Sequence, residues 1–260
     1  MTRYFRIWLH STLDEAQTSF ASRLGVILFT LAKFLRFGFF IIFILLIFTK
    51  TQSLAGYSLW EIIFFYATFN LVDVLPQMFL RSTYRFRNAV VSGNFDFFMV
   101  QPISPLFRAL FGGSDILDIP MLFLSIGFIF YSGMHIPILS VWTAIIYFLL
   151  LCNALLIATA FHIFVLSIGV ATTEVDNTIM LYRDLTQMGR VPITIYSEGV
   201  SFLITFVIPI GIMMTFPVQA LLGALSLQFT LLAFTIGITF FSLSLLAWRK
   251  GIRHYSSASS

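Results

Sequence analysis

Residues 199–248 read GVSFLITFVIPIGIMMTFPVQALLGALSLQFTLLAFTIGITFFSLSLLAW, and this run contains no charged residue and no histidine. A helix needs about 20 apolar residues to cross roughly 30 Å of hydrocarbon, so the run is long enough for two membrane spans. We place these spans at Val200–Met214 and Leu227–Trp248. Because irregular backbone is not tolerated against lipid, we expect Phe216–Gly223 between them to form short helices that dip into the outer leaflet against protein.

The composition of the whole chain agrees with this run. Of its 260 residues, 59% are hydrophobic and only 10% are charged, and the mean hydropathy is +0.96. A soluble globular domain carries roughly a quarter charged residues. The chain is therefore interpreted as an integral membrane protein.

Four more apolar segments bring the number of predicted spans to six. The third segment is short and is marked by Pro120. The sequence thus predicts an all-α membrane protein, a single transmembrane domain over residues 1–260. Its spans are placed at about 26–48, 59–79, 116–131, 140–166, 200–214 and 227–248.

The basic residues predict the orientation of these spans. With the amino terminus inside, 14 of the 15 Lys and Arg residues fall on the inner side, and only Lys50 falls outside. This count places Arg183 and Arg190 on the inner side. Because Lys and Arg favour the cytoplasmic side, we expect a multi-pass protein of the cell membrane with both termini in the cytoplasm. The pI near 9.4 is then explained by topology and contact with anionic lipids, and nucleic acid is not an expected partner.

The first 25 residues lack the apolar core of about 7–15 residues that a signal peptide has. In a helix, Phe5, Leu9 and Leu13 would share one face, with basic side chains beside it. This pattern is typical of a helix that lies in the membrane interface. A plain anchor and a partner-binding element fit it equally well.

Catalytic and cofactor motifs are missing from the sequence. There is no Gly-rich phosphate loop and no serine-hydrolase or zinc-protease motif. Cys152 is the single cysteine, and the four histidines are too scattered for metal-ligand spacing. We therefore expect no enzyme activity, no metal and no cofactor in this chain, so that any ATP would be bound by a partner.

The segment after the second span, residues 81–113, is predicted to be cytoplasmic and to contain a short docking helix. Asn94 is the expected N-cap, Asp96 lies in the first turn near the positive helix end, and Pro102 stops the helix. Such a turn presents Phe95, Phe98 and Met99 on one side, an apolar face suited to a protein groove. The alternative is that this face packs on the protein's own cytoplasmic helix ends.

Ionisable residues inside spans are costly and need a partner or a purpose. Asp73 lies deep in the second span, and Lys33 and Arg36 lie at a similar depth in the first. We predict that Asp73 pairs with Arg36 or Lys33 and holds the two spans together; the alternative is that Asp73 lines a transport path. Asp115 and Asp118 are interpreted as interfacial. Proline offers kinks or hinges, and the candidates are Pro76, Pro209 and Pro217.

Several of these features resemble the permeases of ABC-2 type ABC transporters. Gly93, Asp96 and Pro102 match recurring positions of their coupling-helix region, although Ala89-Val90-Val91-Ser92 stands where acidic residues often precede the glycine. Further matches are Arg190–Tyr196, Val207–Gly211 and Thr215–Gly223, which resemble the subgroup associated with daunorubicin-type or viologen export.

The resemblance implies an ABC-2, type V exporter-like permease fold. It also implies a second permease copy or a sister permease, and a separate ABC ATPase that docks on Gly93, Asn94, Phe95, Asp96, Phe98, Met99 and Pro102. The implied substrate is a hydrophobic or cationic compound moved out of the cell. An ATPase-independent carrier or channel is the first alternative, although no internal repeat is visible. A membrane scaffold or assembly protein is the second.

Overall fold

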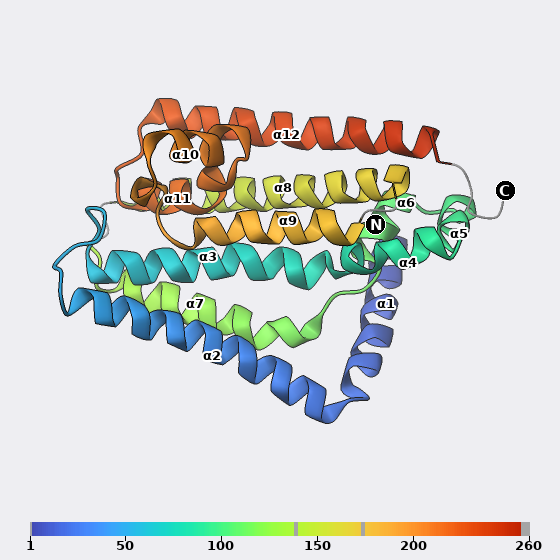
Figure 1. Cartoon of the computed structure of the whole chain (residues 1–260), viewed down its shortest axis with the longest axis horizontal. Coiled ribbons are helices and arrows are strands. Elements are labelled where there is room, and N and C mark those ends of the chain that lie inside the picture. Colours follow the sequence, from blue (N-terminus) through green and yellow to red (C-terminus); the bar gives the residue numbers. More distant parts are fainter. Residues whose placement is uncertain (1, 138–139, 173–174, 256–260) are drawn as a thin grey trace.

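A computed structural model describes residues 2–137, 140–172 and 175–255, and in these ranges the regular elements are all helices (Figure 1). Five helices are long and apolar enough to cross a membrane, and a sixth crossing is possible if one bent helix pair counts as a single span. The fold is therefore an all-helical integral membrane bundle. Its helices, in chain order, are α1 (Thr2–Phe20), α2 (Arg23–Phe48), α3 (Leu59–Phe79), α4 (Phe86–Val91), α5 (Phe95–Val100), α6 (Pro105–Phe111), α7 (Ile119–Gly133), α8 (Val141–Thr172), α9 (Val175–Gln187), α10 (Glu198–Phe202), α11 (Ile210–Leu221) and α12 (Leu227–Arg253).

The span predicted over Val200–Met214 is not one continuous helix in the structure. The chain forms two helical pieces there, Glu198–Val207 and Ile210–Leu221, which are bent by 98° against each other. The break falls at Pro209, which follows the π-helical turn Leu203–Val207. Proline has no N–H for the helix ladder and its ring clashes with the preceding turn. An apolar composition that suffices for a span thus forms a sharply bent helix pair instead.

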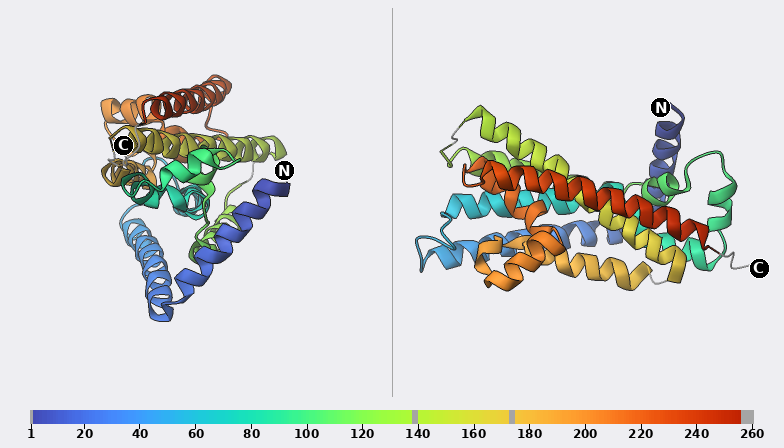
Figure 2. Two further views of the ribbon diagram at one scale, coloured as in Figure 1. Left: turned by 90° about the vertical axis from the view of Figure 1, so that its right-hand side faces the viewer. Right: turned by 90° about the horizontal axis from the view of Figure 1, so that it is seen from above.

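Arg183 and Arg190, which the sequence places on the inner side, belong to helical segments in the structure. They lie on α9 and on the 3₁₀ turn Met188–Arg190 that continues it, and this segment runs back along the bundle beside α8 and α3 (Figures 1 and 2). Three charged residues lower the hydropathy of α9, which is why an apolar run did not reveal this helix in the sequence. The helix is nevertheless packed on one side, through Val175, Ile179, Tyr182 and Thr186.

Helix α1 runs across one end of the bundle instead of along it (Figures 1 and 2). We call this end, which holds α1, α4, α5, α6 and the last turns of α12, the basic end. Here the Trp8 Nε1–H donates to Ser114 Oγ over 2.8 Å, and Glu15 forms an ion pair with Arg85. Since Ser114 and Arg85 belong to the segment after α3, α1 is fixed to this segment as well as to α2.

Two buried clusters hold the helices together. The first fills the middle of the bundle and includes Phe65, Ile157 and Met213. The second lies at the basic end, where Phe86 and Trp248 pack with residues of α5, α8 and α9. Each cluster joins helices from both halves of the chain, so the chain folds as one unit.

Helices α8 and α12 form the most extensive helix contact, and a polar side chain lies inside it. Asn153 Nδ2 donates to the carbonyl oxygen of Ala233 over 3.0 Å, and a Cβ atom on Gly237 would lie 2.0 Å from Asn153 Oδ1. The glycine therefore gives Asn153 the room to bridge the two helices.

We expect Gly237→Ala to destabilise the protein by about 1–3 kcal/mol, because the added methyl group must displace Asn153 from its hydrogen bond. Thermal unfolding in detergent measures the effect. Gly127→Ala on α7 is the matched control, since a Cβ atom there meets nothing within 4 Å and alanine favours a helix. Equal unfolding temperatures for the two variants would contradict this account of the α8–α12 contact.

Candidate functional site

The segment between α3 and α7 forms most of the basic end. It contains a 3₁₀ turn, Arg81–Arg85, followed by α4, α5 and α6. The chain turns from α4 into α5 at Gly93, whose φ of +74° is a left-handed conformation that favours glycine. Gly93 thus sets the angle between the two short helices.

Helix α5 occupies the position predicted for the docking helix. It begins at Phe95 and ends at Val100, and Gln101 before Pro102 is extended (φ −74°, ψ 145°) as a residue preceding proline prefers. Asn94 occupies the N-cap position, as predicted, but its side chain makes no capping hydrogen bond. Asp96 lies in the first turn.

The predicted contact face of α5 points the wrong way. Phe95 is fully buried, with its ring centroid 5.1 Å from that of Phe86, 6.2 Å from Trp248 and 5.0 Å from Tyr255. Phe98 lies beside it, under the guanidinium of Arg108 at 4.8 Å. The alternative reading, in which this face packs on the protein's own helix ends, therefore holds for Phe95 and Phe98. Helical spacing grouped the residues correctly but could not show which face is covered.

The outer face of α5 is also apolar. Phe97 is 64% exposed and Val100 is 78% exposed, while Met99 is 40% exposed and Val91 at the end of α4 is 53% exposed. We call these four residues the α5 ridge. Beside the ridge is an open hollow of about 760 Å³, lined among others by Arg87, Asn88, Gln101 and Arg108. An exposed apolar ridge next to a basic hollow is typical of a protein contact.

Two tyrosines at the basic end have altered acidity. Burial raises the pKa of Tyr84 to about 12, so its phenol stays neutral at physiological pH. Burial, and then the nearby Asp96 carboxylate, raise the pKa of Tyr255. Asp96 thus lies close to the residues that follow α12, and it connects the exposed helix α5 with the last crossing.

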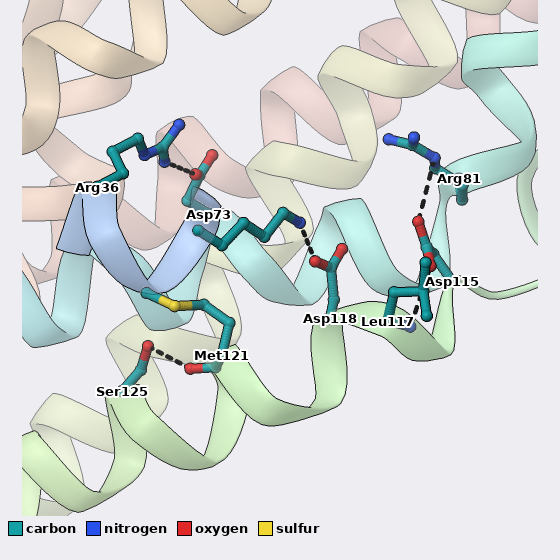
Figure 3. Close-up of polar contacts among 9 residues, drawn as sticks. Arg36, Asp73, Arg81, Asp115, Leu117, Asp118, Met121 and Ser125 are labelled. Carbon is teal, nitrogen blue, oxygen red and sulfur yellow. Dashed lines mark hydrogen bonds and ion pairs between the residues drawn. The ribbon is translucent and has the colours of Figure 1, made fainter. Parts of the chain in front are cut away.

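Three ion pairs connect α2, α3 and the segments next to α3 and α7 (Figure 3). Lys33 on α2 pairs with Asp118, whose side chain is fully buried at the start of α7. Arg81 Nε is 3.4 Å from the carboxylate of Asp115, which is also buried. The interpretation of Asp115 and Asp118 as interfacial is therefore wrong. Both carboxylates are buried and form ion pairs with cations of neighbouring helices.

The third pair joins α2 and α3. Arg36 Nη2 lies 3.6 Å from Asp73 Oδ2, with the arginine side chain 47% exposed (Figure 3). Of the two partners predicted for Asp73, the structure thus places Arg36 beside it and gives Lys33 to Asp118. Asp73 is nearly buried, so its pairing offsets the cost of a carboxylate at this depth.

The three candidate hinge prolines differ in their surroundings. Pro76 and Pro217 lie inside α3 and α11, which both continue past them and bury them. Pro209 stands at the 98° bend between Val207 and Ile210. The backbone alone therefore singles out Pro209 as a break. Within the described residues, no group of three or more His, Cys, Asp or Glu side chains could hold a metal ion.

Comparison with known families identifies the group to which this bundle belongs. The model of a family described as ABC-2 family transporter protein matches residues 34–259, from the middle of α2 to beyond α12. This chain belongs to the ABC-2 transporter family. Neither the curated proteins nor the solved structures gave a match. As an ABC-2 family member with several apolar helices, the chain is a membrane-embedded transport subunit, a permease, and not itself an enzyme.

The ion pair between Lys33 and Asp118 yields a stability prediction for this ABC-2 permease. We expect Asp118→Asn to destabilise the bundle by about 3–5 kcal/mol, because it leaves Lys33 without its buried partner. The double variant Lys33→Met with Asp118→Asn should regain much of this loss. Unfolding in detergent measures both.

The matched control is Asp176→Asn, which breaks the exposed pair of Arg87 and Asp176, 50% and 57% exposed. An exposed pair of this kind contributes about 1 kcal/mol or less. Equal effects of Asp118→Asn and Asp176→Asn would show that the buried pair does not hold α2 against α7.

Proposed function

We propose that this chain is the permease subunit of an ABC exporter, and that a separate ABC ATPase docks on the α5 ridge. The observation that carries the proposal is the exposure of Phe97 and Val100 at the outer surface of the basic end. The proposed setting is the cell membrane, with the basic end and both termini in the cytoplasm, as the distribution of Lys and Arg favours.

The chemistry of the basic end supports a protein partner. Phe97, Met99 and Val100 lie on a helix of six residues at the tip of the bundle, beyond the ends of the long helices (Figure 1). Lipid does not cover such a position, and exposed apolar side chains in water favour burial in a partner's groove. The sequence has no phosphate loop, so ATP-driven transport would need another chain to hydrolyse the ATP. An ATPase supplies both the groove and the energy.

Movement of α5 would be passed on through side chains that are already packed. Phe95 connects α5 to Phe86 on α4 and to Trp248 on α12. Arg81, in the turn just before α4, pairs with Asp115 before α7. A push on the α5 ridge is therefore expected to move α4, α7 and α12 together. Closure of the ATPase would then switch the bundle between two packed arrangements as rigid pieces.

A second permease copy, or a sister permease, is part of the proposal. Only Phe37 and Ile44 of the 26 residues of α2 are buried, so one chain covers little of this helix. A partner permease beside α2 would enclose a path between the two copies. The proposed cargo is a hydrophobic compound, as in the daunorubicin or viologen subgroup, and the charge of its head group depends on the side chains that face the path.

The test is co-purification of the tagged chain from its native membrane in mild detergent. We expect wild-type protein to retain a phosphate-loop ATPase, and Phe97→Asp with Val100→Asp to lose it by tenfold or more. A charge at each of two central apolar contacts costs several kcal/mol of binding, and about 1.4 kcal/mol corresponds to a factor of ten.

The control is Met134→Asp, an equally apolar residue that is 80% exposed at the opposite end of the bundle. The double variant at Phe97 and Val100 and the control Met134→Asp should both keep the unfolding temperature of the wild type. Phe95→Ala, at the buried position, should lower the unfolding temperature strongly. Recovery of the chain without an ATPase from wild-type membranes would favour the carrier or scaffold alternatives.

A further inference from the structure

Arg190 is an arginine at membrane depth without an acidic partner. Its guanidinium carbon lies 6.0 Å from the ring centroid of Phe69, and Phe69 is ten residues from each end of α3. At 1.5 Å per residue, the guanidinium is therefore about 15 Å from either end of that helix. Within the described residues no carboxylate lies within ion-pair distance of Arg190, whereas Lys33, Arg36 and Arg81 each have one.

The donor atoms of Arg190 are incompletely used. Its Nε is buried and has no hydrogen-bond partner, and one turn earlier the Oε1 of Gln187 is also buried without a partner. The guanidinium lies between Phe40 on α2, at 5.7 Å, and Phe69 on α3. Aromatic rings attract a cation, but they cannot replace an acceptor oxygen. Buried donors without acceptors are rare in native proteins, and a bound water, ion or ligand is what satisfies such a donor.

The fold fixes the position of this arginine. Gly189 lies so close to α11 that a Cβ atom there would be 2.6 Å from Met214 Cγ. On the other side of Arg190, Ile193 N–H donates to Thr215 Oγ1 over 3.3 Å, and the Tyr196 hydroxyl donates to the Met188 carbonyl over 2.9 Å. The backbone on both sides of Arg190 is thus held against the bundle. This restricts the positions that its guanidinium can reach, in contrast to an arginine on a free surface.

The charges around Arg190 add up to an excess of one positive charge. Arg190 interacts electrostatically with Arg36 and Asp73, and Asp73 lies within pairing distance of Arg36 alone. The region between α2, α3 and the end of α9 therefore contains two guanidinium groups and one carboxylate. Uncompensated charge in hydrocarbon is expensive, and in membrane proteins it marks substrate and ion pathways.

We propose that Arg190 binds the oxyanion head, a carboxylate or phosphate, of an amphiphilic molecule whose apolar part rests on Phe40, on the little-covered helix α2. A planar guanidinium matches two oxygens of such a head at once. Arg36, half exposed on the little-covered face of α2, adds a second positive charge on the side where the partner permease is placed. As a transport site this inference rests on the proposed function; as a binding site it does not.

The experiment measures saturable binding of radiolabelled octyl phosphate to the full chain in phosphatidylcholine nanodiscs, with empty nanodiscs subtracted. Octanol and octylammonium, which have the same tail, are the competitors. We expect unlabelled octyl phosphate to compete at least about tenfold better than either, the ratio that a charge-assisted hydrogen bond provides. Equal or better competition by octylammonium, or the lack of saturable binding, would overturn the proposal. This comparison needs no variant.

Variants then assign the binding to one residue. Arg190→Gln should weaken octyl phosphate by tenfold or more, and Arg190→Lys should retain part of the affinity. The matched control is Arg183→Gln, seven residues earlier on α9 and exposed, which should stay within about twofold of wild type. Equal affinities of wild type and Arg190→Gln would overturn the assignment.

The source of the oxyanion is decided by adding phosphatidylglycerol to the nanodiscs. Displacement of octyl phosphate would identify a resident lipid head group, and undiminished binding would identify a mobile amphiphile; both place an oxyanion on Arg190. The assay contains no ATPase. Failure to recover an ATPase would therefore refute the proposed function and leave this site standing, whereas a preference for octylammonium would refute the site alone.

Discussion

The ion pair of Lys33 and Asp118 joins α2 to the start of α7 where the chain enters the bundle. The same constraint, that a charge at membrane depth needs a partner, places Arg36 beside Asp73 and Arg81 beside Asp115. These contacts hold α2, α3 and α7 in one arrangement, although α2 buries few of its own side chains. Among the described residues, Arg190 has no carboxylate at ion-pair distance, and this departure from the constraint makes it the candidate for binding an anion.

Much of the bundle can be predicted from the sequence, because long apolar runs have few alternatives in lipid. Helices α2, α3, α8 and α12 lie where these runs occur. Helix α9 could not be predicted in this way, since Asp176, Arg183 and Asp184 hide its packed side from a hydropathy count. The bend at Pro209 could be predicted only as a candidate kink: the apolar composition fits a span, and the 98° angle of the break depends on the backbone around the proline.

The candidate site shows the same division between local and tertiary information. Gly93, Pro102 and the start of α5 follow from local backbone preferences, which sequence spacing reveals. The exposure of Phe97 in place of Phe95 depends on Trp248 and Tyr255, which are more than 150 residues away and fill one side of α5. The expectation of a cationic cargo came from the resemblance, and a positive Arg190 at membrane depth opposes it.

The basic end combines two roles, since α5 carries the exposed α5 ridge while Phe95 of the same helix packs into the buried cluster beneath it. We propose that the α5 ridge faces an ATPase. Because Cys152 is the only cysteine, a Cys152→Ala chain with Phe97→Cys can carry a single photo-crosslinker in native membranes. The account predicts an adduct with a phosphate-loop ATPase at this position and none from Met134→Cys at the opposite end. No ATPase adduct from Phe97→Cys, or the same adduct from both positions, would contradict it.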